Sequence, residues 1–424
     1  MLRKGPIRSG FITSFILYVM SITFLAAQTP LARITVHAGN HPRVQTPVQM
    51  ALEPGFLEPP GNYALRAIGG AQVIPCQVHP ADDRVLIFVL MDSLLPGQKQ
   101  AFNLVRLNEA PDIHVRADTD EKNLTLYHKN RPVLQYHHAT MPPPAGIDTV
   151  FKRSGFIHPL WSPDGHVLTR IQPPDHYHHY GIWNPWTKTR FEGRTIDFWN
   201  LAKNEGTVAH AGYLWQASGP VYGGFQARLD HIDKTAPGGP KVAMHEKRHV
   251  GVWHIPIEGT PAWLIDYTSE LRCASESSII LEQYRYAGFG FRARESWTRW
   301  NSTIQTSEGH DRSTADGTRG RWCMVYGETG TGVSGILFMG HPLNRDFPEP
   351  MRIWPEDENR GRGDVFFNFC PVKQNDWPLE PGSAYVLQYR ILVHEGILSE
   401  ERAERLRNDF AFPPKTEIQY LQPE

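Results

Sequence analysis

Apolar and polar residues alternate over many short stretches of this chain, and clusters of Gly and Pro separate the stretches. An alternation with a period of two is typical of β-strands that bury one face. In the first part of the chain it predicts strands over residues 32–37, 63–67, 85–90 and 101–105. Because turn residues punctuate these runs, we expect a small N-terminal β-sandwich over residues 29–115.

Similar runs continue through the second part of the chain, from residue 120 to residue 398. The expected strands cover residues 124–127, 132–136, 167–171, 250–255, 263–271, 278–286, 322–326, 335–339 and 384–393. So many strands at short spacing favour an all-β domain larger than a simple sandwich. Only the stretch after Ile397 predicts a helix, because Ser399 is a suitable N-cap and acidic residues follow it. We therefore expect an all-β protein with few helices, which ends in a helix and tail over residues 399–424.

The first residues of the chain have a different character. Arg3 and Arg8 flank the start of an apolar run over residues 11–24, and small residues ending at Ala27 follow it. This order is typical of a cleaved secretory signal peptide, here residues 1–27. A single membrane anchor is the alternative, but the run is shorter than the roughly 20 residues that cross a bilayer. We expect an exported protein, periplasmic or extracellular, with no membrane span in the mature chain.

The balance of charge excludes two classes of partner. The chain has 43 Lys and Arg residues against 44 Asp and Glu residues, a formal net charge of −1, and the two signs are mixed along it. Domains that bind nucleic acid or anionic membranes carry a basic patch, which this sequence lacks. We expect a neutral or small partner and no nucleic acid.

Four cysteines, Cys76, Cys273, Cys323 and Cys370, lie too far apart in the sequence for a zinc knuckle. In an oxidising compartment one or two disulfides can form among them, and isolated buried thiols are an equally good interpretation. The sequence leaves this choice open.

Candidate chemistry concentrates in residues 175–181, which read Asp-His-Tyr-His-His-Tyr-Gly. Imidazole has an unperturbed pKa of about 6.5, so it exchanges protons near neutral pH. Pro173 and Pro174 precede the segment and exclude a helix, which indicates a rigid loop after the predicted strand over residues 167–171. Gly181 then allows the backbone to turn.

The direction of each side chain in this loop depends on its backbone. In an extended segment, His176 and His178 would face one way, and Asp175 and His179 the other. One of these faces would then line a cleft, and solvent-exposed loop histidines are the alternative. Charged and aromatic residues flank the segment on both sides, and we expect them to form the wall of a polar ligand site; they are Arg170, Trp183, Trp186, Arg194, Asp197 and Trp199.

Several spaced motifs identify a family resemblance. They are Arg153 with His158-Pro159, the turn over residues 163–165, Asp175-His176-x-His178-His179-x-Gly181-x-Trp183, Tyr286-x-Gly288-Phe289-x-Phe291-Arg292, His341-Pro342-x-Asn344 and Phe366-Phe367-Asn368. Over residues 120–395 these motifs resemble the DUF6807 family, exported bacterial proteins often labelled methane oxygenase PmoA-like. The oxygenase label does not fit, because a methane monooxygenase subunit crosses the bilayer several times and this mature chain has no stretch long enough to cross once.

The resemblance implies a fold and a class of ligand. The family's domain is similar to the galactose mutarotase-like β-supersandwich, a fold that also carries polysaccharide lyases and glycosidases. This similarity implies a large antiparallel β-supersandwich with a carbohydrate ligand in a cleft. Aldose epimerases of that fold use a His as acid and a Glu as base; here Glu282 is the nearest candidate for the base, and no catalytic assignment transfers intact.

The leading hypothesis is an exported enzyme of carbohydrate metabolism that uses histidines for proton transfer, as a lyase, dehydratase, epimerase or hydrolase. The expected catalytic residues are His176, His178, His179 and Asp175. The expected substrate-binding residues are His158, Arg170, Trp183, Arg194, Asp197, Arg292, His341 and Asn344.

Two alternatives remain open. In the first, the protein is not an enzyme and binds glycans through its aromatic residues. In the second, two imidazoles and a carboxylate of the histidine segment hold a divalent metal ion, although their spacing matches no helical zinc motif. The leading hypothesis requires no cofactor.

Overall fold

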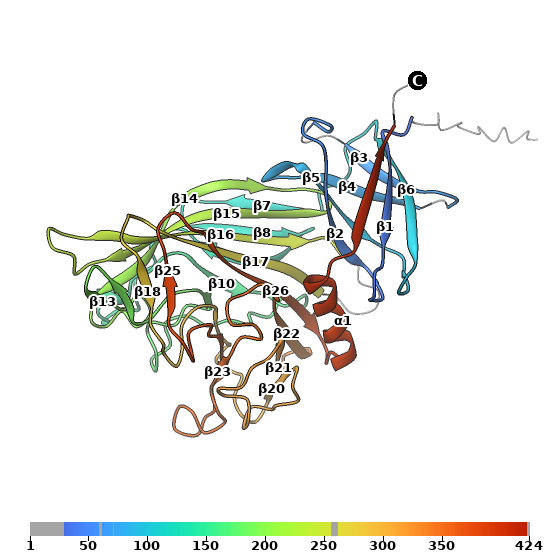
Figure 1. Ribbon diagram of the computed structural model, residues 1–424. Coiled ribbons are helices and arrows are strands. Elements are labelled where there is room, and N and C mark those ends of the chain that lie inside the picture. Colours follow the sequence, from blue (N-terminus) through green and yellow to red (C-terminus); the bar gives the residue numbers. More distant parts are fainter. Residues whose placement is uncertain (1–28, 59–61, 71, 256–261, 422–424) are drawn as a thin grey trace, which may run out of the picture.

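A computed structural model describes residues 29–58, 62–70, 72–255 and 262–421 (Figure 1). The expected signal peptide lies outside these residues. Within them, nearly every regular element is a β-strand, and all paired strands are antiparallel, which confirms the all-β prediction. Of the described helices, none is both long enough and apolar enough to span a membrane.

The N-terminal sheet encloses a hydrophobic core of its own. In spatial order its strands are β2 (Thr46–Ala51), β5 (Asp82–Leu90), β4 (Val73–His79), β3 (Tyr63–Ala67), β6 (Lys99–Arg106), β1 (Ala32–His37) and β27 (Lys415–Tyr420). Alternate residues of these strands, such as Ile34, Val48 and Phe88, are fully buried against one another. The last strand pairs with the first along its whole length, so the C-terminal tail returns to the N-terminal domain (Figure 1).

Two larger sheets form the main body, and we call them the site sheet and the long sheet. The site sheet has the order β23 (Met351–Ile353), β24 (Phe366–Phe369), β19 (Gly290–Arg292), β11 (Ile182–Trp183), β10 (Phe156–Leu160), β9 (Arg131–His137), β8 (Asn123–His128) and β7 (Val115–Thr119). The long sheet has the order β14 (Gly206–Ala217), β15 (Tyr222–Asp233), β16 (Lys241–Trp253), β17 (Ala262–Cys273), β26 (Tyr385–Glu395), β22 (Gly332–Gly340), β21 (Trp322–Thr329) and β20 (Ser302–Thr306).

The two sheets share the largest core of the molecule. Side chains from both, together with those of neighbouring loops, form one buried hydrophobic cluster. Strand alternation decides which residues enter it: Ile182 and Phe367 point into this core, whereas their neighbours Trp183 and Phe366 belong to a second cluster on the outer face of the site sheet. This second cluster is the floor on which the histidine loop rests.

The remaining elements are short. A small sheet contains β13 (Arg194–Ile196), β12 (Thr189–Phe191), β18 (Ile279–Leu281) and β25 (Trp377–Leu379), and the helical turn η1 covers Thr149–Phe151. The helix α1 (Glu400–Ala411) begins where the sequence predicts, with the Ser399 side chain accepting a hydrogen bond from the Arg402 N–H. Beyond α1, the predicted tail forms β27.

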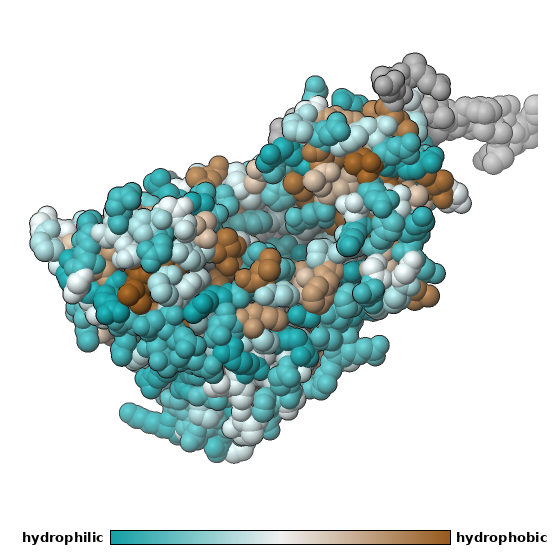
Figure 2. Space-filling model, in the orientation of Figure 1, coloured by the Kyte–Doolittle hydropathy of each residue, from teal (hydrophilic) through white to brown (hydrophobic). Residues whose placement is uncertain are grey.

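The N-terminal domain is joined to the outer face of the long sheet by apolar and polar contacts. Ile87 and Val89 of β5 pack in one buried cluster with residues of the long sheet and of α1. The Gln77 side chain accepts hydrogen bonds from the backbone N–H groups of Val221 and Tyr222 and donates one to the Tyr222 carbonyl. Figure 2 shows the visible face of the molecule covered mainly by hydrophilic side chains, with hydrophobic ones in small patches.

Several strand predictions differ from the structure, and the open question of the cysteines is answered. Residues 167–171 form no strand, because Val167, Thr169 and Ile171 each bridge to a different partner segment. The strand predicted over residues 278–286 is only β18, and the long strands β14 and β15 were not predicted. All four cysteines are free thiols.

One buried carboxyl group gives the fold a testable pH dependence. Glu349 is fully buried and accepts hydrogen bonds from Asn344 and the Tyr389 hydroxyl, 2.7 and 2.9 Å long. Burial raises its pKa from 4.5 to about 8. Between these pH values only the folded state keeps the proton, so the free energy of unfolding should fall as pH rises from 4.5 to 8 and level off above that.

Glu349→Gln should therefore flatten this dependence and make the variant more stable than the wild type at pH 8, by roughly a few kcal/mol. Urea unfolding at pH 5 and pH 8 measures the difference. Glu276→Gln, a change at an exposed carboxyl group, is the control. Equal pH dependence in the wild type and Glu349→Gln would contradict the assignment.

Candidate functional site

Two successive turns fold the histidine loop back on itself. The His176 N–H donates to the Pro173 carbonyl, and the His179 N–H donates to the His176 carbonyl, at 2.9 and 3.0 Å. The prediction of a loop after the two prolines is confirmed, and the loop is turned, so the case of an extended segment with opposite faces does not apply. Instead, one ring nitrogen from each of His176, His178 and His179 lies within 4.8 Å of the others. We call these three residues the histidine cluster.

Gly181 fixes the end of the loop. Its φ angle is +64°, and a Cβ atom at this position would lie 2.3 Å from the Ile157 carbonyl oxygen. A side chain cannot occupy that space without moving the backbone of β10, so only glycine fits. The glycine thereby lets the loop pass close against β10, an interior strand of the site sheet.

The histidine cluster forms one wall of a cavity of about 180 Å³. The other lining residues come from three segments far apart in the sequence, and they are Trp199, Asn200, Arg285, Tyr286, Arg352, Trp354, Glu358 and Phe366. Asn200 and Tyr286, joined by a 2.8 Å hydrogen bond, also line a neighbouring cavity of about 310 Å³. The two cavities thus meet at this pair, and aromatic rings and polar groups alternate around them.

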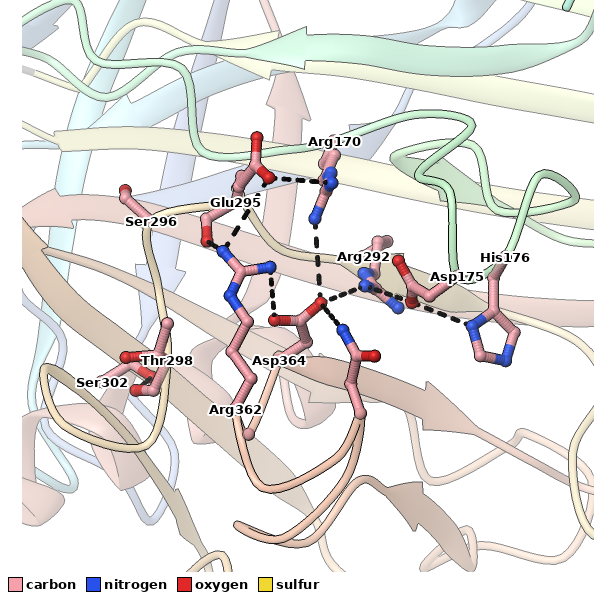
Figure 3. A network of polar contacts seen from close by, with 12 residues as sticks. Arg170, Asp175, His176, Arg292, Glu295, Ser296, Thr298, Ser302, Arg362 and Asp364 are labelled. Atoms are coloured by element: carbon pink, nitrogen blue, oxygen red, sulfur yellow. Dashed lines mark hydrogen bonds and ion pairs between the residues drawn. The ribbon is translucent and has the colours of Figure 1, made fainter.

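A buried guanidinium group holds the loop from behind. Arg292 is 1% exposed and lies 2.7 Å from both Asp175 and Asp364 (Figure 3). Its guanidinium also lies over the Trp354 ring, 4.5 Å from the ring centre. Asp364 in turn accepts a hydrogen bond from Asn359. Because a buried cation is costly without partners, these contacts tie the histidine loop to the loop before β24.

Asp175 determines which nitrogen of His176 is available. The His176 Nδ1 lies 2.9 Å from the Asp175 carboxylate. Burial alone would raise the pKa of Asp175, but the hydrogen bond from His176 and the charge of Arg292 hold it well below its usual range. An ionised carboxylate only accepts hydrogen bonds, so Nδ1 is the donor in this pair and Nε2 is the ring nitrogen left for a ligand. This is the arrangement in which proteins orient metal-binding histidines.

The other two histidines are neutral near pH 7. Burial, assisted by the charges of Arg153 and Arg292, lowers the pKa of His178 to about 3. Burial also lowers the pKa of His179 well below 6.5. The His179 Nδ1 lies 3.5 Å from the Arg292 guanidinium, which is too long to fix its tautomer. Neutral imidazoles are poor proton donors and good ligands of metal ions.

Part of the predicted binding set lies around the cluster without lining its cavity. Trp183 is fully buried beneath it, with its ring centre 5.1 Å from that of His179. Arg170 pairs with Glu295 at 3.1 Å and lies 3.7 Å from Asp364 (Figure 3). Asp197 lines the neighbouring cavity and accepts hydrogen bonds from the backbone of Trp199 and Asn200.

The other predicted residues have their own partners away from the cavity. His158 contacts the Thr169 hydroxyl, and Arg194 pairs with Asp233 at 2.7 Å. Neither side chain lines the histidine cavity. The candidate base Glu282 also lies elsewhere and pairs with Arg190.

The motif around His341 lies on the other side of the molecule. His341 packs edge-on against Phe410 of α1, and the buried Asn344 side chain donates to the Gln388 carbonyl and to Glu349. A ligand-binding role for either residue would therefore concern a site other than the histidine cavity.

Sequence reasoning missed five residues that line the cavity, one of which, Asn200, directly follows Trp199. The other four are Arg285, Trp354 and Glu358 of loops and Arg352 of β23, and all lie more than a hundred positions after the histidines. No local pattern marks them. The family motifs that contain Tyr286 and Phe366 were the available signal, since both of these residues also line the cavity.

Three solved structures show partial similarity to this chain. A substituted GH36 α-galactosidase AgaA from Geobacillus stearothermophilus, in complex with raffinose, matches at 10% identity over 66% of this chain and 40% of that chain, with a TM-score of 0.30. The α-galactosidase from Lactobacillus brevis matches at 9% identity over 69% and 40%, with a TM-score of 0.30. A galactose mutarotase related enzyme from Lactobacillus acidophilus matches at 8% identity over 66% and 97%, with a TM-score of 0.26.

These likenesses carry no inference about activity, because the TM-scores are low and the chain spans about 40% of the length of the α-galactosidases. Comparison with curated proteins found no match. A family model does match residues 123–408, well over half of the chain, and it describes a family of unknown function, DUF6807. The chain belongs to the DUF6807 family.

Proposed function

We propose that His176, His178 and His179 hold a divalent metal ion, best matched by zinc, in a carbohydrate-active enzyme. The observation that carries the proposal is the convergence of three imidazole nitrogens within 4.8 Å at the wall of a cavity. Imidazole is a favoured ligand of zinc, and catalytic zinc sites commonly use three protein ligands and leave one position open. A bound ion would act there as a Lewis acid or activate water.

The surroundings of the cluster support a metal site over direct proton transfer by histidine. Asp175 orients His176 in the manner of a carboxylate that supports a metal ligand. His178 and His179 are neutral, so neither supplies a proton near pH 7. Zinc–nitrogen bonds of about 2.0–2.1 Å would draw the rings together by roughly 1 Å.

The walls of the cavity support a sugar ligand. Tyr286 and Trp354 offer aromatic surface, and Asn200 and Glu358 offer hydrogen-bonding groups. Glu358 is the carboxylate among the lining residues and is therefore our candidate for the base that accepts a proton from the sugar. Arg285 would favour a ligand that carries an anionic group, whereas Arg352 is already paired with Asp316 at 2.6 Å.

Removing one ligand should abolish tight metal binding. Wild-type protein, dialysed after loading with Zn²⁺, should retain about one ion per chain, and His178→Ala should retain almost none. Elemental analysis gives the stoichiometry, and calorimetric titration with Zn²⁺, Mn²⁺ and Ca²⁺ gives the preference. Turnover of oligosaccharides, followed by mass spectrometry and proton NMR, should fall on chelation and return with the ion.

His245→Ala is the matched control. His245 is also paired with a carboxylate, Asp230 at 2.7 Å, but it lies outside the histidine cluster. If the wild type binds no more metal than His178→Ala, the metal proposal fails. Turnover that survives chelation would favour the hypothesis of direct proton transfer by histidine. Saturable sugar binding without turnover would identify a glycan-binding protein.

The Asp175 carboxylate, which contacts His176, should increase the affinity of the cluster for the ion. Asp175→Asn removes the acceptor that holds His176 and should raise the metal Kd by about 10–100-fold. It should also lower thermal stability, because Arg292 loses one of its two buried carboxylate partners. Glu295→Gln alters the exposed end of the same ion network and should leave the metal Kd unchanged. An unchanged Kd in Asp175→Asn would contradict the orienting role.

A further inference from the structure

A polar row crosses the outer face of the long sheet, opposite the shared core. Strand register places Trp215 beside Gln226, Gln226 beside His249, His249 beside Thr268, and Thr268 beside Gln388. These five residues therefore come from five adjacent strands, β14 to β17 and β26. Their neighbours along the strands, such as Phe225, Val250 and Tyr267, point into the core, so alternation directs the row outward.

The N-terminal domain and α1 cover this row and leave a cavity of about 400 Å³. The row forms its floor. The roof contains Pro47, Gln49, His79 and Ala81 of the N-terminal domain and Asp409, Phe410, Pro413 and Pro414 of the C-terminal segment. A cavity of this size at a domain junction lies within the range of small-ligand sites.

The floor offers hydrogen-bonding groups that the protein does not use. In the part of the chain that the structure describes, the side chains of Gln226, Thr268 and Gln388 make no hydrogen bond, although all three are half-buried. The Trp215 indole N–H is buried and also lacks a partner. The polar atoms of the first three side chains are open to solvent or to a ligand, and the buried indole N–H of Trp215 is costly without a partner.

The charged groups of the cavity are already paired. Arg390 makes two contacts with Asp266, at 2.6 and 3.0 Å, and Asp409 pairs with Arg43 at 2.8 Å. Burial lowers the pKa of His249 to about 4, so its ring is neutral near pH 7. The cavity therefore presents neutral donors and acceptors beside an indole ring.

We propose that this interdomain cavity is a second binding site, for a neutral oligosaccharide, separate from the histidine cavity. The row places one hydrogen-bonding side chain on each strand, and adjacent strands are about 4.8 Å apart, so the floor spans roughly 19 Å from Trp215 to Gln388. An extended, hydroxyl-rich chain can satisfy such a row along its length, with one sugar face against the Trp215 indole. The site would hold a glycan while the histidine cavity acts on a neighbouring chain.

Calorimetry and proton NMR with neutral di- to tetrasaccharides of glucose, galactose, mannose and xylose test the proposal. At least one of these should bind the full-length wild type saturably. Thr268→Val keeps the shape of the side chain and removes its hydroxyl; combined with Gln388→Leu, it should raise the Kd at least about tenfold. Trp215→Ala should weaken binding by a similar factor.

Two variants separate this site from its surroundings. Lys247→Gln changes the same face of β16 one row away, outside the cavity, and should leave the Kd unchanged. His178→Ala should also leave it unchanged, which distinguishes this site from the proposed metal centre. The proposal would be overturned if none of the neutral sugars binds, or if only uronate oligosaccharides bind. It would also be overturned if the Kd responds to His178→Ala and not to Thr268→Val/Gln388→Leu. Circular dichroism confirms that each variant is folded.

Discussion

The need to neutralise one buried cation organises the candidate site. Arg292 leaves the site sheet at β19 with its guanidinium group almost fully buried, and two carboxylates, Asp175 and Asp364, are each 2.7 Å from it. Losing one partner of such a group typically costs about 3–5 kcal/mol, so the two loops that carry the carboxylates are held against β19. One of these loops presents the histidine cluster, and the other lies beside Trp354 and Glu358 of the opposite wall. The ion network is therefore a support of the cavity and not a surface for ligands.

The β-sheets supply two distinct surfaces for such sites. The site sheet turns Trp183 and Phe366 outward and so gives the histidine loop a rigid apolar floor. The long sheet turns a polar row outward, and the N-terminal domain closes over it. Because β27 pairs with β1, the last described strand belongs to the same domain as the first, and α1 is held between the two domains. Both proposed sites thus lie on strands whose other face is packed in a core, which limits their movement.

Local sequence patterns were sufficient to predict several strands and the C-terminal helix, but not the geometry of the two proposed sites. Alternation identified β1, β3 and most of β17 and β26, and the Ser399 cap located α1, because these signals are contained in a few neighbouring residues. The turns that bring the histidines together depend on contacts with β10 and Arg292, so the local sequence did not predict them. Arg285, Arg352 and Glu358 reach the cavity only through the tertiary fold. The polar row likewise could not be predicted from any one strand, because its residues become neighbours only through the pairing register of five strands.

The central claim is that three imidazoles meet at one metal ion. Crystals of the protein grown with zinc, with diffraction recorded on both sides of the zinc absorption edge, test this most directly, because anomalous scattering locates the ion without assuming its ligands. The account expects one strong peak bonded to nitrogens of His176, His178 and His179 at about 2.0–2.1 Å. A map without a peak at these residues, from crystals in which zinc is found at other positions of the protein, would contradict it.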